Sequence, residues 1–406
     1  MASKTILNLD HRAGGAHLPE VAEAMKSAVD QPSFSRRSVH RFGVQAKDVI
    51  ARCHGQVRTL LGVSEEFEIT LGSGLLEVVN LGILGYVLAN ERKGRHILAS
   101  VNEHPVVEGC LRWLEGRGFE VSRVGLDGQG RVRIDELENQ IRQETLLICL
   151  HLSDSDLGTI QSTKMLFELS SRYGKALFLE GDCFVGLESV DLDVSLPIFL
   201  AFSLTRIGAP SGVGALVYPR MIPFEPILHE GRYQVGIRSE SLTPAGVIGF
   251  GVAAEVAHRE RGDWQVQLGK RETEFIEALL DGVPNTMLLG PVEAGSRLWG
   301  HINMVFEFVE GHGLALRLDT QGLLVGTGSI CDIGRNSMPP SLEAIHLPPS
   351  LGKSNLIFTL GCRDQSWDVK AAVSCIQDSV AFLREMSLDW ESYLKGSLQS
   401  RVERRN

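Results

Sequence analysis

The sequence lacks the features that would place it in several special classes of protein. No apolar run approaches the length of a membrane span, so we expect no membrane interaction. The first residues, MASKTILNLD, show no signal-peptide pattern, which makes the cytoplasm the expected location. A net charge of −10 over 406 residues provides no broad basic surface, so we expect no nucleic-acid partner.

Cysteine and lysine are sparse where their chemistry would matter. The seven cysteines form no CxxC pair and show no metal-ligand spacing, so no metal site is expected. In a reducing compartment most of them would be small buried apolar residues. No lysine occurs between Lys175 and Lys270, which bears directly on the central motif of the chain.

The chain does contain a regular alternation of strand-like and helix-like segments. Apolar runs at 96–101, 120–126 and 146–152 read as strands, and helical patterns lie between them. With 43% hydrophobic residues, the chain can bury a sizeable core. This rhythm predicts an α/β fold with a mainly parallel, doubly wound sheet.

The most informative stretch spans residues 198–218. The apolar run IFLAF leads to Ser203 and a turn, and a Gly-rich passage then leads to a second apolar run, ALVY. This stretch resembles the lysine segment of the class V aminotransferases, in particular the NifS-like cysteine desulfurases and selenocysteine lyases. In that group Ser-x-His-Lys precedes Gly-Pro-x-Gly-x-Gly-Ala-Leu. Here the lysine position holds Arg206, while the family spacing is kept at Ser203, Pro210, Gly212, Gly214 and Ala215.

The resemblance extends from about residue 6 to 386 and implies the fold of the type I pyridoxal phosphate (PLP) dependent transferases. It implies a large domain over 15–260 and a small α/β domain formed by 1–14 plus 261–390, followed by a polar tail over 391–406. It also implies a homodimer with shared sites.

The resemblance further implies where PLP would bind. The Gly-Ser-Gly turn at 72–74 precedes a helix, whose free N–H groups favour an anion, and the family places the PLP phosphate there. His104 corresponds to the family histidine that stacks on the ring. Glu180 stands where the family has an aspartate that bonds the pyridine nitrogen. The implied cofactor-binding positions are Ser73, Gly74, His104, Ser155, Glu180, Cys183, Ser203, Thr205, Arg206, Arg238 and Ser241.

Several positions depart from the family pattern. Leu76 replaces a hydroxyl residue near the phosphate, Cys183 replaces a glutamine, and Ile357 replaces the arginine that holds the substrate carboxylate. Cys331 retains the position of the family's catalytic thiol within Gly-Thr-Gly-Ser-Ile-Cys. The candidate catalytic residues are therefore Cys331, His104 and Arg206.

A Schiff base needs a primary amine that can lose its proton, and arginine cannot provide one. We therefore expect a protein that has lost this chemistry and binds PLP non-covalently or not at all. It would act as a scaffold or regulatory partner, for example of a sulfur-acceptor or iron–sulfur assembly protein. The alternative is a residual enzyme or a persulfide carrier that uses Cys331. Arg206 itself could pair with a phosphate, another anion or Glu180.

Overall fold

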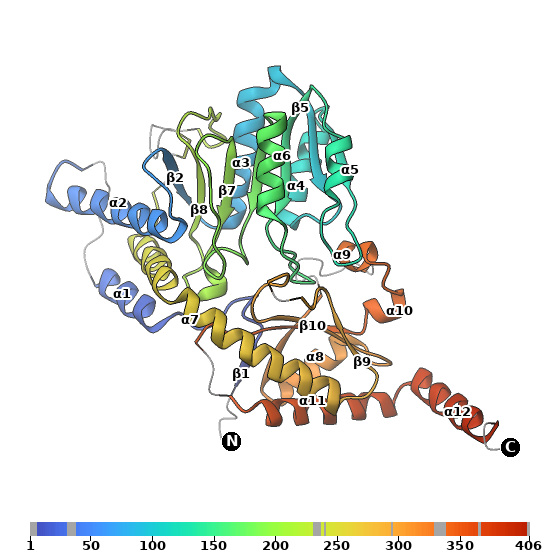
Figure 1. The fold of residues 1–406 in the computed structure, drawn as a ribbon. Helices are drawn as coiled ribbons and strands as arrows, with labels where there is room; N and C mark the ends of the chain where they lie inside the picture. The colour runs from blue at the N-terminus through green and yellow to red at the C-terminus, as the bar shows by residue number, and fades with distance from the viewer. Residues whose placement is uncertain are drawn as a thin grey trace.

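The computed structural model describes residues 6–30, 38–229, 237–238, 241–293, 295–328, 338–363 and 367–403. Two sheets organise these residues (Figure 1). The long helix α7 (Pro244–Gly282) packs against α1 (Pro19–Val29) and α2 (Arg41–Leu61) and also against elements of the smaller sheet. It therefore connects the two parts of the molecule.

The larger sheet has seven strands in the order β2-β8-β7-β6-β5-β3-β4. Neighbours from β7 to β4 are parallel, whereas β8 runs antiparallel to both β7 and β2. The sequence prediction of a mainly parallel sheet is confirmed. The strands are β2 (Phe67–Gly72), β3 (His96–Ser100), β4 (Glu120–Val124), β5 (Thr145–His151), β6 (Ala176–Glu180), β7 (Ile198–Phe202) and β8 (Gly214–Pro219).

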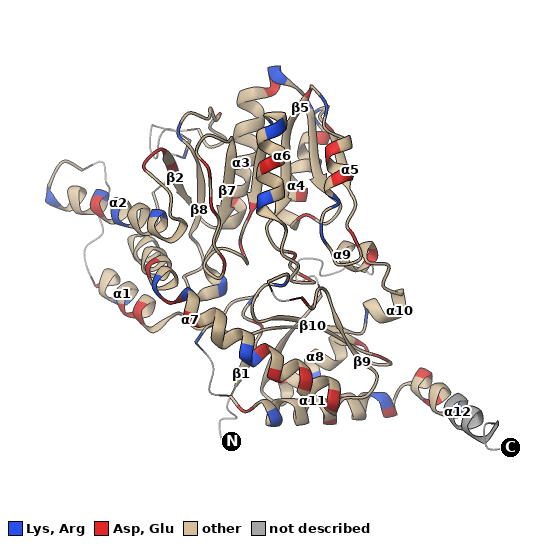
Figure 2. Cartoon of the chain, viewed as in Figure 1, with Lys and Arg blue, Asp and Glu red and all other residues tan. Residues whose placement is uncertain are grey.

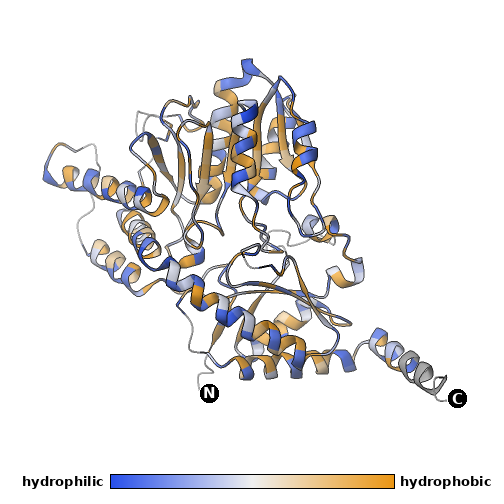
Figure 3. Ribbon diagram, viewed as in Figure 1, coloured by the Kyte–Doolittle hydropathy of each residue, from blue (hydrophilic) through white to orange (hydrophobic). Residues whose placement is uncertain are grey.

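Helices cover both faces of this sheet, so its central strands are buried on both sides. Residues of β5, β6, β7 and β8 are all buried, and these strands are largely apolar in Figure 3. Such continuous apolar runs are typical of parallel strands that pack against helices on each face. The helices are α3 (Leu75–Asn90), α4 (Pro105–Glu115), α5 (Ile134–Asn139) and α6 (Thr163–Tyr173).

The smaller sheet has five strands in the order β1-β11-β12-β10-β9. The N-terminal strand β1 pairs in parallel with β11, so the first residues of the chain join a sheet made mostly from its last third. The strands are β1 (Leu7–Leu9), β9 (Thr286–Leu289), β10 (His301–Phe306), β11 (Leu323–Thr327) and β12 (Asn355–Thr359). The helices are α8 (Gly311–Thr320), α9 (Pro340–Ala344), α10 (Pro349–Gly352) and α11 (Val369–Glu385).

The stretch expected to be a polar tail from residue 391 belongs to helix α12 (Leu388–Glu403). The rings of Trp390 and Tyr393 lie 5.3 and 4.9 Å from that of Phe308, which anchors the start of this helix. Charged residues, coloured blue and red in Figure 2, are found mostly on helices and loops. Among the described residues, no helix combines the length and apolar character needed to cross a membrane. The domain boundaries given above remain predictions.

Candidate functional site

A cavity of about 380 Å³ opens at the carboxyl ends of β3, β5 and β6. In parallel sheets this edge is where ligands bind, because strand ends and helix starts converge there. Its wall comes from the β3–α4 connection, from the residues that follow β5, and from the last residue of β6. Pro340 of α9 contributes from the side of the smaller sheet.

Three of the predicted site residues line this cavity: His104, Ser155 and Glu180. The others in the described part of the chain lie outside its wall, namely Ser73, Gly74, Cys183, Ser203, Thr205, Arg206, Arg238 and Ser241. Cys331 lies outside the described residues, and its role as a thiol remains a prediction.

Arg206 follows β7 in a short turn, Thr205–Ile207, at the place in the fold where the sequence motif positions it. Its side chain is only 3% exposed, yet its one hydrogen bond runs from Nη2 to the carbonyl of Trp299, at 3.3 Å. Nε and Nη1 are buried without a hydrogen-bond partner among the described residues. The pairing with Glu180 that the sequence left open is therefore absent here. Arg206 is directed to the segment that precedes β10.

Burial of the Arg206 guanidinium lowers its pKa, because few compensating partners surround the charge. The thiols of Cys183 and Cys362 and the carboxylate of Asp10 are the groups that offset this effect. Burial likewise raises the pKa of Cys183 to about 12 and that of Cys362 to about 11. At neutral pH both thiols are protonated, so Arg206 has no thiolate counter-ion.

Replacing Arg206 by methionine is expected to increase the free energy of unfolding by about 1–2 kcal/mol, since a poorly paired buried charge gives way to a side chain that needs no partner. Urea denaturation would measure this difference. The matched control is Arg220→Met, which breaks an exposed pair with Glu68 and should change stability by less than about 0.5 kcal/mol. A loss of stability in the Arg206 variant would contradict the prediction.

No lysine lines the cavity in the part of the chain that the structure describes. The sequence motif excluded a neighbouring lysine along the chain, and the fold adds that no described lysine enters from another element. Among the described residues, an amine positioned for a Schiff base is therefore missing from this wall.

Two of the predicted cofactor-binding residues, Ser73 of the phosphate turn and Arg238, are engaged with Glu77 at the start of α3. The Ser73 N–H donates to Oε2 of Glu77 at 2.6 Å, and Arg238 Nε donates to Oε1 at 2.7 Å. Burial alone would raise the pKa of Glu77, but the hydrogen bonds from Arg238 and Ser73 outweigh it and lower that pKa. An incoming phosphate would compete with this carboxylate. Leu76, in place of the family hydroxyl, is exposed.

Glu180 ends β6 with its side chain at the inner wall of the cavity. Its Oε1 accepts a hydrogen bond from the backbone N–H of Asp182 at 2.6 Å. Burial, together with the negative charge of Asp182, raises the pKa of Glu180 to about 8. Asp182 in turn accepts from the backbone N–H of Ser203 at 2.9 Å, so the ends of β6 and β7 are held together.

His104 caps α4, and its Nδ1 accepts a hydrogen bond from the backbone N–H of Val106 at 3.2 Å. The proton of the neutral ring is therefore assigned to Nε2, and burial lowers the pKa of His104. Deeper in the wall, Nδ1 of His151 lies 3.7 Å from Oε1 of Glu103. Burial would lower the pKa of His151, but the nearby negative charge of Glu103 raises it to about 9.

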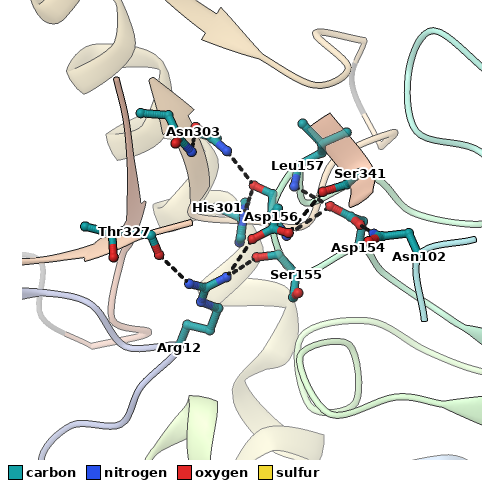
Figure 4. A network of polar contacts seen from close by, with 11 residues as sticks. Arg12, Asn102, Asp154, Ser155, Asp156, Leu157, His301, Asn303, Thr327 and Ser341 are labelled. Atoms are coloured by element: carbon teal, nitrogen blue, oxygen red, sulfur yellow. Dashed lines mark hydrogen bonds and ion pairs between the residues drawn. The ribbon is translucent and has the colours of Figure 1, made fainter. Parts of the chain in front are cut away.

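The Glu103–His151 pair was not predicted from the sequence, although both residues end or follow apolar runs expected to be strands. The polar network beside the cavity was not predicted either (Figure 4). In that network the backbone carbonyl of Asp156 accepts hydrogen bonds from the side chains of His301 at 2.9 Å and Asn303 at 3.0 Å. The side-chain Oδ2 of Asp156 accepts a hydrogen bond from the hydroxyl of Ser341 at 3.0 Å. The two closely spaced aspartates in the segment 153–156 were the feature of the sequence that could have indicated this network.

Arg12 completes this network from the segment after β1. Its guanidinium donates to the carbonyls of Ser155 and Thr327 and lies 3.5 Å from Oδ1 of Asp156. Its backbone N–H donates to Oγ1 of Thr359 at 2.9 Å. Ser155 and Asp156 follow a strand of the larger sheet, whereas the two threonines belong to the smaller sheet. Arg12 therefore joins the two sheets next to the cavity.

The two-sheet architecture, with a cavity at the carboxyl ends of the parallel strands, defines the fold as that of the type I PLP-dependent transferases. The chain belongs to the aminotransferase class-V family, which matches residues 7–347. A cysteine desulfurase IscS of Methanosarcina thermophila is 33% identical over 383 residues, covering 93% of each chain. Cysteine desulfurase IscS 1 of Archaeoglobus fulgidus is 31% identical over 369 residues, covering 90% of this chain and 95% of the relative.

Solved structures agree on the fold. A NifS-like protein superimposes with a TM-score of 0.85 at 22% sequence identity, covering 93% of this chain and all of the other. A NifS-like protein from Rickettsia africae gives a TM-score of 0.80 at 18% identity. These likenesses confirm the sequence prediction of a type I PLP-transferase fold.

The residues present do not fit a covalently held PLP. Arg206 occupies the lysine position and is directed to Trp299, and no described lysine lines the cavity. The predicted cofactor-binding residues Ser73 and Arg238 are both engaged with Glu77. Of the predicted cofactor contacts among the described residues, His104, Ser155 and Glu180 lie at the cavity wall.

Proposed function

We propose that this chain is a cysteine desulfurase-like protein that has lost Schiff-base PLP catalysis and acts as a scaffold or regulatory partner in sulfur, selenium or iron–sulfur metabolism. The observation that carries the proposal is the buried Arg206 at the lysine position, together with a cavity wall that contains no described lysine. Arginine cannot supply the neutral amine that a Schiff base requires.

The proposed setting follows from the relatives, which are named cysteine desulfurases. We propose a homodimer in the cytoplasm, with a sulfur-acceptor or iron–sulfur assembly protein as its partner and with PLP held non-covalently or absent. Size-exclusion chromatography with light scattering tests the dimer, and pull-down with a purified sulfur acceptor tests the partner. A monomeric protein that binds no sulfur acceptor would contradict the proposed homodimer and the proposed partner.

The protein purified in the presence of PLP is expected to show no Schiff-base absorption band near about 420 nm and to release no sulfide from cysteine. The physical reason is that Arg206 provides no nucleophilic amine. Absorption spectra and a PLP assay after denaturation test for the Schiff base and for bound PLP. A sulfide assay tests separately for activity on cysteine. Sulfide release by the wild-type protein would overturn the proposal.

The informative variant is Arg206→Lys, with Arg220→Lys as the matched control on the surface. A Schiff-base band in the first variant and none in the second would assign the loss to this one side chain. If the band returns without sulfide release, then the other departures, such as Ile357 in place of the carboxylate-binding arginine, also block the reaction. Ile357 is fully buried within β12.

A further inference from the structure

The inner wall of the cavity holds two carboxyl groups, those of Glu180 and Glu103, and each has one oxygen without a hydrogen-bond donor among the described residues. Glu180 is only 4% exposed and lines the cavity, and its single described hydrogen bond uses Oε1 alone. Oε2 of Glu180 therefore has no hydrogen-bond donor among the described residues. Glu103 also lines the cavity, its side chain is fully buried, and its Oε2 has no hydrogen-bond partner. A buried oxygen such as Oε2 of Glu103 is costly unless something donates to it.

The arginines near the cavity do not supply those donors. Arg112 and Arg123 line it, but both bind Oε1 of Glu108 at 3.0 Å, and Arg123 also binds Glu115 at 2.9 Å. Arg12 is committed to Asp156 and to two backbone carbonyls. These cations therefore neutralise carboxylates other than Glu180.

Two histidines, His104 and His151, also line the cavity. His151 pairs with the other oxygen of Glu103, at 3.7 Å, and its Nε2 lies 3.3 Å from the side-chain amide of Gln161. His104 uses Nδ1 to accept a backbone hydrogen bond. Neither has a described hydrogen bond to Glu180, so Oε2 of Glu180 is left for a ligand.

We propose that this cavity binds a small organic cation that carries N–H donors, an amine or a guanidine, with Glu180 as the anchoring carboxylate. The inference rests on the proposed loss of Schiff-base chemistry, because a covalently held PLP would fill the same space. A volume of about 380 Å³ suits a small molecule. Burial raises the pKa of Glu180 to about 8, so its side chain gives up a proton to solvent as the cation binds, and a charge-assisted hydrogen bond then joins the two. This pairing favours a cation over an anion such as phosphate.

The test is a binding titration by calorimetry with 1,4-diaminobutane and methylguanidine, alongside thermal unfolding with each. Both probes should bind the wild-type protein and raise its unfolding temperature. Tetramethylammonium, a cation without N–H donors, should bind at least about tenfold more weakly, since it offers no hydrogen bond to Glu180. Inorganic phosphate and PLP should raise the unfolding temperature less than the amines do.

The variant Glu180→Gln removes the charge while keeping the size and the acceptor for the Asp182 N–H. It should bind the amines roughly 10- to 100-fold more weakly. Glu103→Gln should also weaken binding, and Asp281→Asn, an exposed carboxylate on α7 outside the cavity, should not. Circular dichroism shows whether each variant is folded.

Four results would overturn the inference: no binding of either amine, equal binding of tetramethylammonium, equal binding by folded Glu180→Gln, or stronger stabilisation by phosphate or PLP. None of these results touches the proposed function, which depends on the 420 nm band and on sulfide release. Conversely, sulfide release by the wild-type protein would contradict the proposed function, and the titration with amines would still decide separately whether the cavity binds a cation.

Discussion

Replacing Arg12 by alanine is expected to lower the free energy of unfolding by about 3–5 kcal/mol, the usual cost of removing one partner of a buried ion pair. The side chains of Arg12 and Asp156 are 8% and 6% exposed, so water cannot solvate the carboxylate that the variant leaves behind. The variant also leaves the carbonyls of Ser155 and Thr327 without this donor. Urea denaturation measures the loss.

The matched control for this prediction is Arg172→Ala, which removes an ion pair of good geometry from the surface. Arg172 lies 2.7 Å from Glu138, but its side chain is 62% exposed, so the loss should stay below about 1 kcal/mol. Similar small losses in both variants would show that Arg12 does not hold the two sheets together. Because the contacts of Arg12 reach both sheets, we also expect the Arg12 variant to unfold over a broader range of urea.

Between pH 6.5 and 8 the free energy of unfolding should fall as the pH rises, by about 3 kcal/mol in total. Glu180 contributes because its pKa is raised to about 8 in the folded protein from an ordinary value of 4.5. In this window the folded protein holds that proton and the unfolded chain does not. The unfolded chain thus binds fewer protons, and stability declines by about 1.4 kcal/mol per pH unit for each such group.

His151 acts in the same direction. Its pKa is raised to about 9 by Glu103, so the stability it provides is complete below pH 6.5 and is lost as the pH rises through 9. His104 and His301 have lowered pKa values and affect stability below pH 6.5, outside this window. Burial raises the pKa of Asp154 to about 6, so this group has lost most of its proton by pH 6.5 and changes stability mainly below that pH.

The variant Glu180→Gln isolates the carboxylate, because it should remove about half of the pH dependence while leaving the contribution of His151. At pH 8 it should be more stable than the wild type by about 1–2 kcal/mol. Denaturation curves at pH 6.5, 7.25 and 8 measure both effects. An unchanged slope in the variant would show that Glu180 is ionised throughout this range.

Much of the fold could be predicted because its signals are local. Apolar runs of strand length, separated by helical patterns, gave the order of elements, and β7 ends at Phe202, directly before the predicted Ser203. The family motif also placed Arg206 correctly in the turn after that strand. A local pattern did not predict α12, since its first turn depends on ring packing with Phe308, which lies far away in the chain.

The candidate site was only partly predictable because it depends on contacts between distant residues. The sequence named His104, Ser155 and Glu180, which do line one cavity, but it gave no sign of the contacts of Arg12 with residues more than 140 positions away. It also left open whether Arg206 would face Glu180, and the structure directs it to Trp299.

The sequence by itself determined the family, the order of strands and helices, and the absence of a lysine at the central motif, because each depends on residue identity and short spacing. Only the tertiary structure decided which charges are buried and which of them are paired. Burial gives Glu180 a raised pKa and leaves Arg206 with a single hydrogen bond. Desolvation and pairing depend on how distant segments pack, and a linear pattern carries little information about that packing.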